Sequence, residues 1–240
     1  MKIITVTNLK GGVGKTTSAV NIAYSLSTKE GCRVLVVDVD PQANLTPFFV
    51  RQLTGKTILD LYKNPANVRS CIYKTRYDRI DIIKGNTGLR EDDVQNIGDL
   101  GTALRKEYDY YDYCIIDTRP AFERITLSAI HAADTVLIPV NMDKFCRDNL
   151  NLVDDMMDSI GKSNWNIFVT KINARSKSQR ENYEDLLSRH DYPFLETAIS
   201  RSADVDNALN LYKPVGKHKS KSVVAADYDD LAEEIAGLEV

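Results

Sequence analysis

A glycine-rich segment near the start of the chain constrains its fold more than any other feature. Residues 10–17 read Lys-Gly-Gly-Val-Gly-Lys-Thr-Thr, between a β-branched run, Ile3–Thr7, and an amphipathic segment, Ser18–Ser27. Strand, glycine loop and helix in this order form the context that a phosphate-binding loop requires. Glycines let the backbone curl so that successive N–H groups point at an anion, and the helix N-terminus adds partial positive charge. The segment therefore predicts an α/β fold that binds phosphate.

Individual residues of this loop suit a nucleotide with a bound magnesium ion. Lys15 can reach the terminal phosphates, and the Thr16 hydroxyl is placed to ligate Mg²⁺. The nucleotide-binding residues that the loop pattern itself predicts are Gly11, Gly12, Val13, Gly14, Lys15, Thr16 and Thr17. A chance glycine turn is disfavoured because strand, spacing, lysine and threonine are all in place. Lys10 is not needed by a plain phosphate loop, and the alternative for it is a solvated surface lysine.

Strand-like and helix-like patterns alternate along the rest of the chain. Predicted strands are Lys2–Thr7, Arg33–Asp38, Arg79–Lys84, Tyr113–Asp117, Thr135–Val140, Asn166–Lys171 and Phe194–Ile199. Predicted helices are Thr16–Ser27, Thr57–Tyr62, Thr87–Glu107, Glu123–Ala132, Asn149–Ile160, Ser178–His190, Ala203–Leu211 and Ala225–Ile235. Several strands are apolar on both faces, which indicates burial between two helix layers. We therefore expect one domain over residues 1–240, a doubly wound, mostly parallel sheet with ligands at the carboxyl strand ends.

Acidic residues follow two of these strands. Asp38 and Asp40, two residues apart, end the second strand, and Asp117 ends the fourth. Carboxylates at strand ends beside a phosphate loop can serve the magnesium shell and the attacking water. The alternative for Asp40 is an Asx-type turn before Pro41. An acid after an apolar strand is a weak signal alone, so Asp117 gains its value from the loop that accompanies it.

Together these motifs resemble the ParA/MinD family of P-loop ATPases. Residues 10–17 look like its deviant Walker A motif, and residues 38–42 look like its Asp-x-Asp-Pro-Gln motif. The resemblance covers nearly the whole chain and is strongest in the first forty-odd residues. It implies ATP and Mg²⁺ as cofactors and an ATP-dependent homodimer, in which Lys10 reaches the partner's nucleotide. It further implies Lys10, Lys15 and Asp40 as catalytic residues and Thr16, Asp38 and Asp117 as the magnesium site.

Two further points concern the same resemblance. The family usually continues Asp-x-Pro-Pro after its second acidic strand, whereas this chain has Arg119 in place of the first proline. The departure leaves open how closely hydrolysis and dimerisation follow the family pattern. Asn173 and Pro214 are the predicted adenine-side contacts; the alternative for Asn173 is an amide that caps its own loop.

Charge is unevenly distributed. The whole chain has a formal net charge of −3, but residues 161–221 hold 11 Lys and Arg against 7 acids. A basic segment on an acidic protein suggests a local anion-facing surface. The family resemblance implies non-specific double-stranded DNA as the anion. Candidate contacts are Lys171, Arg175, Lys177, Arg201, Lys213 and Lys217, and the alternative for each is a solvated surface charge.

The resemblance implies plasmid or chromosome partitioning, in the cytoplasm at the nucleoid, with hydrolysis stimulated by a ParB-like centromere-binding partner. A DNA-independent ATPase switch that positions a protein complex remains the alternative. We expect no membrane partner, because residues 227–235 are acidic and anionic lipid would repel them. Four cysteines occur without a Cys-x-x-Cys spacing, so we expect neither disulfides nor a metal–thiolate site.

Overall fold

The computed structural model describes residues 1–52, 54–143, 146–173, 176–188 and 192–238. Its eight-stranded sheet has the order β3-β4-β2-β5-β1-β6-β7-β8. All neighbouring strands run parallel except β3, which is antiparallel to β4 at one edge. The strands are β1 (Lys2–Val6), β2 (Val34–Asp38), β3 (Ile72–Lys74), β4 (Ile80–Ile83), β5 (Tyr113–Asp117), β6 (Thr135–Asn141), β7 (Trp165–Ile172) and β8 (Phe194–Ser200).

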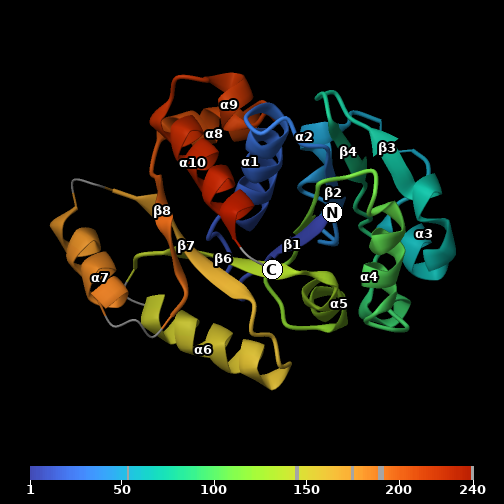
Figure 1. Cartoon of the computed structure of the whole chain (residues 1–240), viewed down its shortest axis with the longest axis horizontal. Helices are drawn as coiled ribbons and strands as arrows, with labels where there is room; N and C mark the ends of the chain where they lie inside the picture. Colours follow the sequence, from blue (N-terminus) through green and yellow to red (C-terminus); the bar gives the residue numbers. More distant parts are fainter. Residues whose placement is uncertain (53, 144–145, 174–175, 189–191, 239–240) are drawn as a thin grey trace.

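Helices cover both faces of this sheet (Figure 1). On one face, α1 packs against α10 with α8 and α9 beside them, and the other face carries α3, α4, α5 and α6. The α-helices are α1 (Lys15–Thr28), α2 (Thr46–Phe49), α3 (Ile58–Lys63), α4 (Asp99–Leu104), α5 (Arg124–Ala132), α6 (Cys146–Ser159), α7 (Lys177–Ser188), α8 (Ala203–Asn210), α9 (Val215–His218) and α10 (Val223–Gly237). Short 3₁₀ helices are η1 (Pro65–Cys71), η2 (Glu91–Asp93) and η3 (Arg105–Glu107).

Apolar side chains on successive strand residues explain the two layers. Ile3 and Ile4 are neighbours in β1, yet they belong to hydrophobic clusters on opposite faces of the sheet. Leu35 and Val36 divide in the same way in β2. Because side chains alternate along a strand, a run that is apolar throughout must be buried on both sides. The predicted doubly wound, mostly parallel α/β fold is confirmed.

All seven predicted strands are present with ends within one residue of the prediction, and the short edge strand β3 was not predicted. The predicted helix Thr87–Glu107 is wrong, because η2, α4 and η3 divide that segment. Asn86 and Asn96 each accept a hydrogen bond on the side-chain oxygen from a glycine N–H two residues on. These Asx turns compete with helix formation and break the segment. No helix among the described residues has the length and apolar character needed to cross a membrane.

Candidate functional site

The glycine loop lies between β1 and α1, at the carboxyl edge of the sheet. Gly12 and Gly14 have φ of 73° and 97°, a left-handed conformation that favours glycine, and Gly14 begins α1 as its N-cap. A cavity of about 270 Å³ opens over the loop. Its lining residues are Gly11, Gly12, Gly14, Lys15, Thr16, Thr17, Asp40, Thr118, Pro120 and Lys171. Glycine backbone, a helix N-terminus and two lysines make this cavity suitable for phosphate groups.

Two backbone carbonyl groups fix the Lys15 ammonium group beside this cavity. Its Nζ donates to the carbonyl oxygens of Asn8 and Lys10, both at 2.9 Å, and the residue is 7% exposed. Burial lowers the pKa of Lys15, while the carboxylates of Asp117 and Asp40 oppose this shift. An ammonium group has three N–H bonds. A phosphate oxygen can therefore accept one of them while both carbonyl contacts remain.

Asp38 and Asp117 lie side by side at the ends of the paired strands β2 and β5. Asp38 Oδ2 accepts hydrogen bonds from the Thr46 N–H (2.9 Å) and hydroxyl (2.7 Å). Within the described residues, Asp38 Oδ1 and both carboxylate oxygens of Asp117 are buried without a hydrogen-bond partner. A Cβ at Gly85 would lie 2.8 Å from the Asp38 carboxylate, so only glycine leaves room for it.

The electrostatics of these two carboxylates fit a divalent cation. Burial raises the pKa of Asp38 to about 7. Burial and the adjacent Asp38 raise the pKa of Asp117 well above its usual range, although the nearby Thr16 hydroxyl and Lys15 lower it in part. Buried carboxylate oxygens without partners are costly unless a cation compensates them. Oxygen ligands from two acids and a threonine are those that Mg²⁺ prefers, so Thr16, Asp38 and Asp117 fit the predicted ion.

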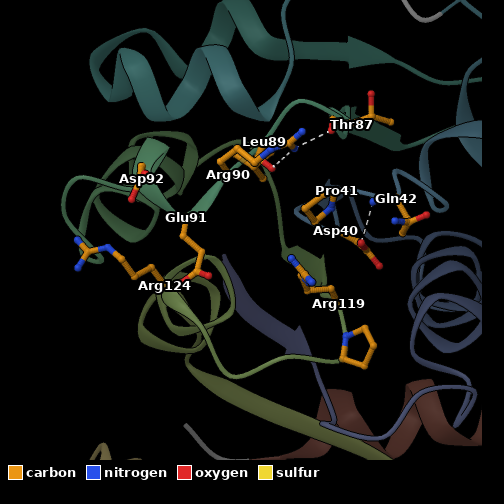
Figure 2. Close-up of a pocket in the computed structure, with 11 residues that line it drawn as sticks. Asp40, Pro41, Gln42, Thr87, Leu89, Arg90, Glu91, Asp92, Arg119 and Arg124 are labelled. Carbon is orange, nitrogen blue, oxygen red and sulfur yellow. Dashed lines mark hydrogen bonds between the residues drawn. The ribbon is translucent and has the colours of Figure 1, made fainter.

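A second, larger cavity of about 940 Å³ adjoins the phosphate cavity and shares Asp40 and Pro120 with it (Figure 2). Asp40 lies at the junction, where its Oδ1 accepts a hydrogen bond from the Gln42 N–H at 2.8 Å. Arg119 lines the larger cavity and forms an ion pair with Glu123 at 2.7 Å. Asp40 therefore lies beside both the phosphate cavity and a larger cavity that can admit water or part of a partner protein.

Lys10 and Lys171 occupy positions that the sequence did not specify. Lys10 forms an ion pair with Asp143 and is not among the residues that line the phosphate cavity. Lys171, the penultimate residue of β7, has a φ of 57°, and its Nζ donates to the Gly12 carbonyl oxygen at 2.7 Å. Lys171 was predicted as a DNA contact; its side chain is exposed and also contacts the phosphate loop, so its role in DNA binding stays a prediction. Its position at the carboxyl end of a parallel strand is the signal that could have identified it.

Thr170 joins the same strand to the loop and was also missed by sequence reasoning. Its hydroxyl donates to the Val13 carbonyl oxygen at 2.8 Å. The predicted adenine-side residues lie elsewhere, since neither Asn173 nor Pro214 lines the phosphate cavity. Asn173 is exposed and donates its backbone N–H to Gln179 Oε1 at 2.8 Å, while Pro214 is buried ahead of α9. Their role in adenine binding stays a prediction.

The remaining predicted DNA contacts are exposed side chains. Lys177, Arg201, Lys213 and Lys217 are all exposed, and Lys177 pairs with Glu181 at 3.6 Å. Arg175 lies outside the described residues. Lys177 and Arg201 lie on the β7–β8 side of the sheet, Lys213 lies in the turn between α8 and α9, and Lys217 lies in α9. Exposed cations spread over this region are compatible with a polyanion, but they form no cavity with the phosphate loop.

Comparison with known proteins finds the same architecture elsewhere. A family model described as "AAA domain" matches residues 1–172. The sporulation initiation inhibitor protein Soj of Bacillus subtilis is 29% identical over 249 residues, covering 98% of each chain. The cell division ATPase MinD of Pyrococcus furiosus superimposes with a TM-score of 0.83 at 26% identity, covering 99% of each chain. Cyanothece McdA without nucleotide gives 0.85 at 24% identity, covering 99% of this chain and all of McdA.

Proposed function

The chain belongs to the ParA/MinD superfamily of ATPases, and we propose that it is a ParA-type partition ATPase whose ATP-bound dimer binds DNA without sequence preference. The observation that carries this proposal is the loop cavity near two buried carboxylates, three of whose four oxygens have no hydrogen-bond partner among the described residues, together with end-to-end similarity to Soj. A second relative, the chromosome partitioning protein ParA of Myxococcus xanthus, is 29% identical over an alignment that covers 98% of this chain and 87% of that protein.

In the proposed reaction, the residues of this chain position ATP and its charges. The loop N–H groups and Lys15 bind the phosphates, and Asp40 orients the attacking water at the junction of the two cavities. Thr16, Asp38 and Asp117 would hold Mg²⁺, which neutralises phosphate charge when bound. Because phosphoryl transfer depends mainly on positioning and charge neutralisation, no strong general base is required. Intrinsic turnover is expected to be slow.

Lys171 supplies a testable part of this site. Lys171 and Lys15 both line the phosphate cavity, so Lys171 would place a second positive charge beside a bound phosphate. Replacing Lys171 with methionine keeps the apolar stem and removes the charge, and we expect ATP affinity to fall about 10-fold, as for one charge-assisted hydrogen bond. Fluorescence titration with a labelled ATP analogue measures the change. Lys177→Met, an exposed site on α7, is the control, and unchanged affinity in Lys171→Met would refute this role.

Dimerisation would use the face that carries the phosphate loop. Lys10 is half-buried beside Asp143 and lies outside the phosphate cavity of its own chain. Release from Asp143 would let the Lys10 side chain extend toward the nucleotide of a second copy. A ParB-like partner that stimulates hydrolysis would then act on the assembled dimer, and DNA binding would place the protein at the nucleoid.

A positioning switch that acts without DNA is the second candidate. One observation favours it: Lys171, one of the predicted DNA contacts, is bound to the phosphate loop, which leaves the remaining exposed cations scattered. The structural similarity to MinD and McdA is as extensive as the sequence similarity to Soj. In this second candidate, ATP still drives dimerisation, and a protein complex takes the place of DNA.

Binding to a random DNA duplex distinguishes the two. We expect tight binding with ATP and Mg²⁺, little with ADP or without nucleotide, and a steep loss as salt rises from 50 to 200 mM, by roughly 10³-fold for six phosphate contacts. Arg201→Ala should weaken this binding, whereas Arg69→Ala, on the opposite edge of the sheet, should not. ATP-dependent dimers that ignore DNA in a sizing or crosslinking assay would support the positioning switch.

A further inference from the structure

A basic cleft lies at the β3 edge of the sheet, away from the nucleotide cavities. It has a volume of about 640 Å³ and lies between the segment after α2 and the strands β3 and β4. None of its lining residues is shared with the phosphate cavity or with the larger cavity beside it. Four of the described lining residues are cationic and none is acidic: Arg51, Lys74, Arg76 and Lys84. The composition points to an anionic ligand.

Lys84 is the central group of this basic cleft. It follows β4, is 2% exposed, and its Nζ lies 3.9 Å from the centre of the Tyr73 ring. That nitrogen also donates to the Thr54 carbonyl oxygen. Within the part of the chain that the structure describes, no carboxylate pairs with Lys84, and burial lowers its pKa. A buried ammonium without a counter-ion is costly, so a ligand that supplies negative charge would be bound favourably.

The other cations hold fixed or adaptable positions around Lys84. Arg76 donates from Nε and Nη2 to the Phe48 carbonyl oxygen, at 3.0 and 2.7 Å, which holds its guanidinium in place. No carboxylate of the described residues pairs with that guanidinium. Arg51 is exposed at the rim. Lys74 is bound to Asp81 at 2.8 Å and is 77% exposed at its side chain, so it contributes least. The cleft thus combines the buried Lys84, the hydrogen-bonded Arg76 and the exposed Arg51.

We propose that this basic cleft binds a phosphate group, with Lys84 and Arg76 as its main contacts and Arg51 closing over it. A tetrahedral oxyanion presents several oxygens at once and can accept hydrogen bonds from converging ammonium and guanidinium donors. The volume exceeds that of a single phosphate and falls in the range of small-molecule sites. The phosphate belongs either to a free phosphorylated solute or to the DNA backbone. The proposal does not depend on the proposed function, because the nucleotide cavities share no residue with the cleft.

The first test uses inorganic pyrophosphate as the probe, in a Lys15→Ala background that weakens the phosphate loop. Isothermal titration should show binding that Lys84→Met weakens at least 10-fold and that Arg51→Gln weakens two- to fivefold. Lys162→Met is the matched control, since Lys162 is also partly buried, donates to a backbone carbonyl and has a pKa lowered by burial, but lines no cavity described above. Methionine matches the length of lysine and removes a buried charge, so Lys84→Met should remain folded.

The second test repeats the random-duplex assay on the ATP-bound protein with an intact Lys15. Loss of pyrophosphate binding alone in Lys84→Met identifies a free phosphorylated solute, and loss of DNA binding alone or with it identifies the backbone phosphate. If Lys84→Met and Arg51→Gln match the Lys162→Met control in both assays, the proposal is wrong. The pyrophosphate assay needs neither ATP nor DNA, so its result is independent of the partition ATPase proposal.

Discussion

Replacing Lys15 with alanine is expected to abolish ATP hydrolysis and to weaken ATP binding more than any other single change in the chain. The ammonium is 7% exposed and is held over the loop by two carbonyl oxygens, so its charge meets the phosphates with little screening. Loss of one well-placed cation from a buried site costs roughly 3 kcal/mol or more, which corresponds to at least about 100-fold in turnover. Phosphate release and nucleotide titration measure the two effects.

The control for this change is Lys29→Ala. Lys29 is the exposed C-cap residue of the same helix, α1. Its replacement therefore removes one positive charge without changing the cavity. Circular dichroism should show both variants folded, because alanine is favourable in a first helical turn. Turnover in Lys15→Ala within threefold of the parent protein would contradict the assignment of residues 10–17 as the catalytic phosphate loop.

Replacing Asp117 with asparagine is expected to reduce Mg²⁺-dependent hydrolysis by at least about 100-fold, as for loss of a metal-positioning group, and yet to stabilise the nucleotide-free protein. Both oxygens of Asp117 are buried with no hydrogen-bond partner in the part of the chain that the structure describes, beside the equally buried Asp38. Asparagine has a similar shape and no charge. In the absence of metal, the substitution therefore removes the repulsion between the two carboxylates and the cost of burying the charge of Asp117. Calorimetry without nucleotide and a hydrolysis assay with Mg²⁺ measure the two opposite effects.

The stability effect also depends on pH. Since the folded-state pKa values of Asp38 and Asp117 are raised, the native protein binds more protons than the unfolded chain above the ordinary carboxyl pKa of about 4. Stability without metal should therefore fall as pH rises from about 4 to about 7, where Asp38 titrates, and level off once both groups are ionised. Asp117→Asn should flatten this decline, and Mg²⁺ with nucleotide should offset it in the parent protein.

Asp230→Asn is the control for both measurements, because Asp230 is an exposed acid on α10. It should leave hydrolysis and the pH dependence of stability close to those of the parent protein. An Asp117→Asn variant that unfolds more readily than the parent at pH 7 would show that Asp117 has structural partners. A variant that hydrolyses ATP normally would show that Asp117 has no role toward the ion.

The features that could be predicted from sequence are those set by local patterns. The loop at residues 10–17 and the strands that end in Asp38 and Asp117 each carry their own signal, and parallel strands bring their carboxyl ends to one edge. The break in the segment 87–107 was missed because it depends on Asx turns at Asn86 and Asn96, which compete with an otherwise helical pattern. Side-chain hydrogen bonds of this kind leave little trace in hydrophobic periodicity.

Two lysines show why the rest of the site needed the fold. Lys171 was grouped with surface cations because its neighbours in sequence are basic, whereas β7 brings it to Gly12, 159 residues away in the chain. Lys84 ends an ordinary apolar strand, and its burial depends on Tyr73 and Thr54, which lie on separate segments. In both cases the deciding contact joins residues that are far apart in the sequence or involves an irregular loop, so no local sequence pattern could specify it.

The bonds between β7 and the phosphate loop have a consequence for communication across the protein. Lys171 binds Gly12, and the next residue, Ile172, accepts a hydrogen bond on its carbonyl oxygen from the Arg201 N–H at 2.8 Å. The route from the loop that would sense the nucleotide to an arginine on the exposed basic region therefore consists of two hydrogen bonds, the Lys171 side chain and the peptide unit between Lys171 and Ile172. A displacement of Gly12 on hydrolysis would be transmitted along this route to Arg201. The state of the nucleotide would then change the affinity of the exposed basic region for its ligand.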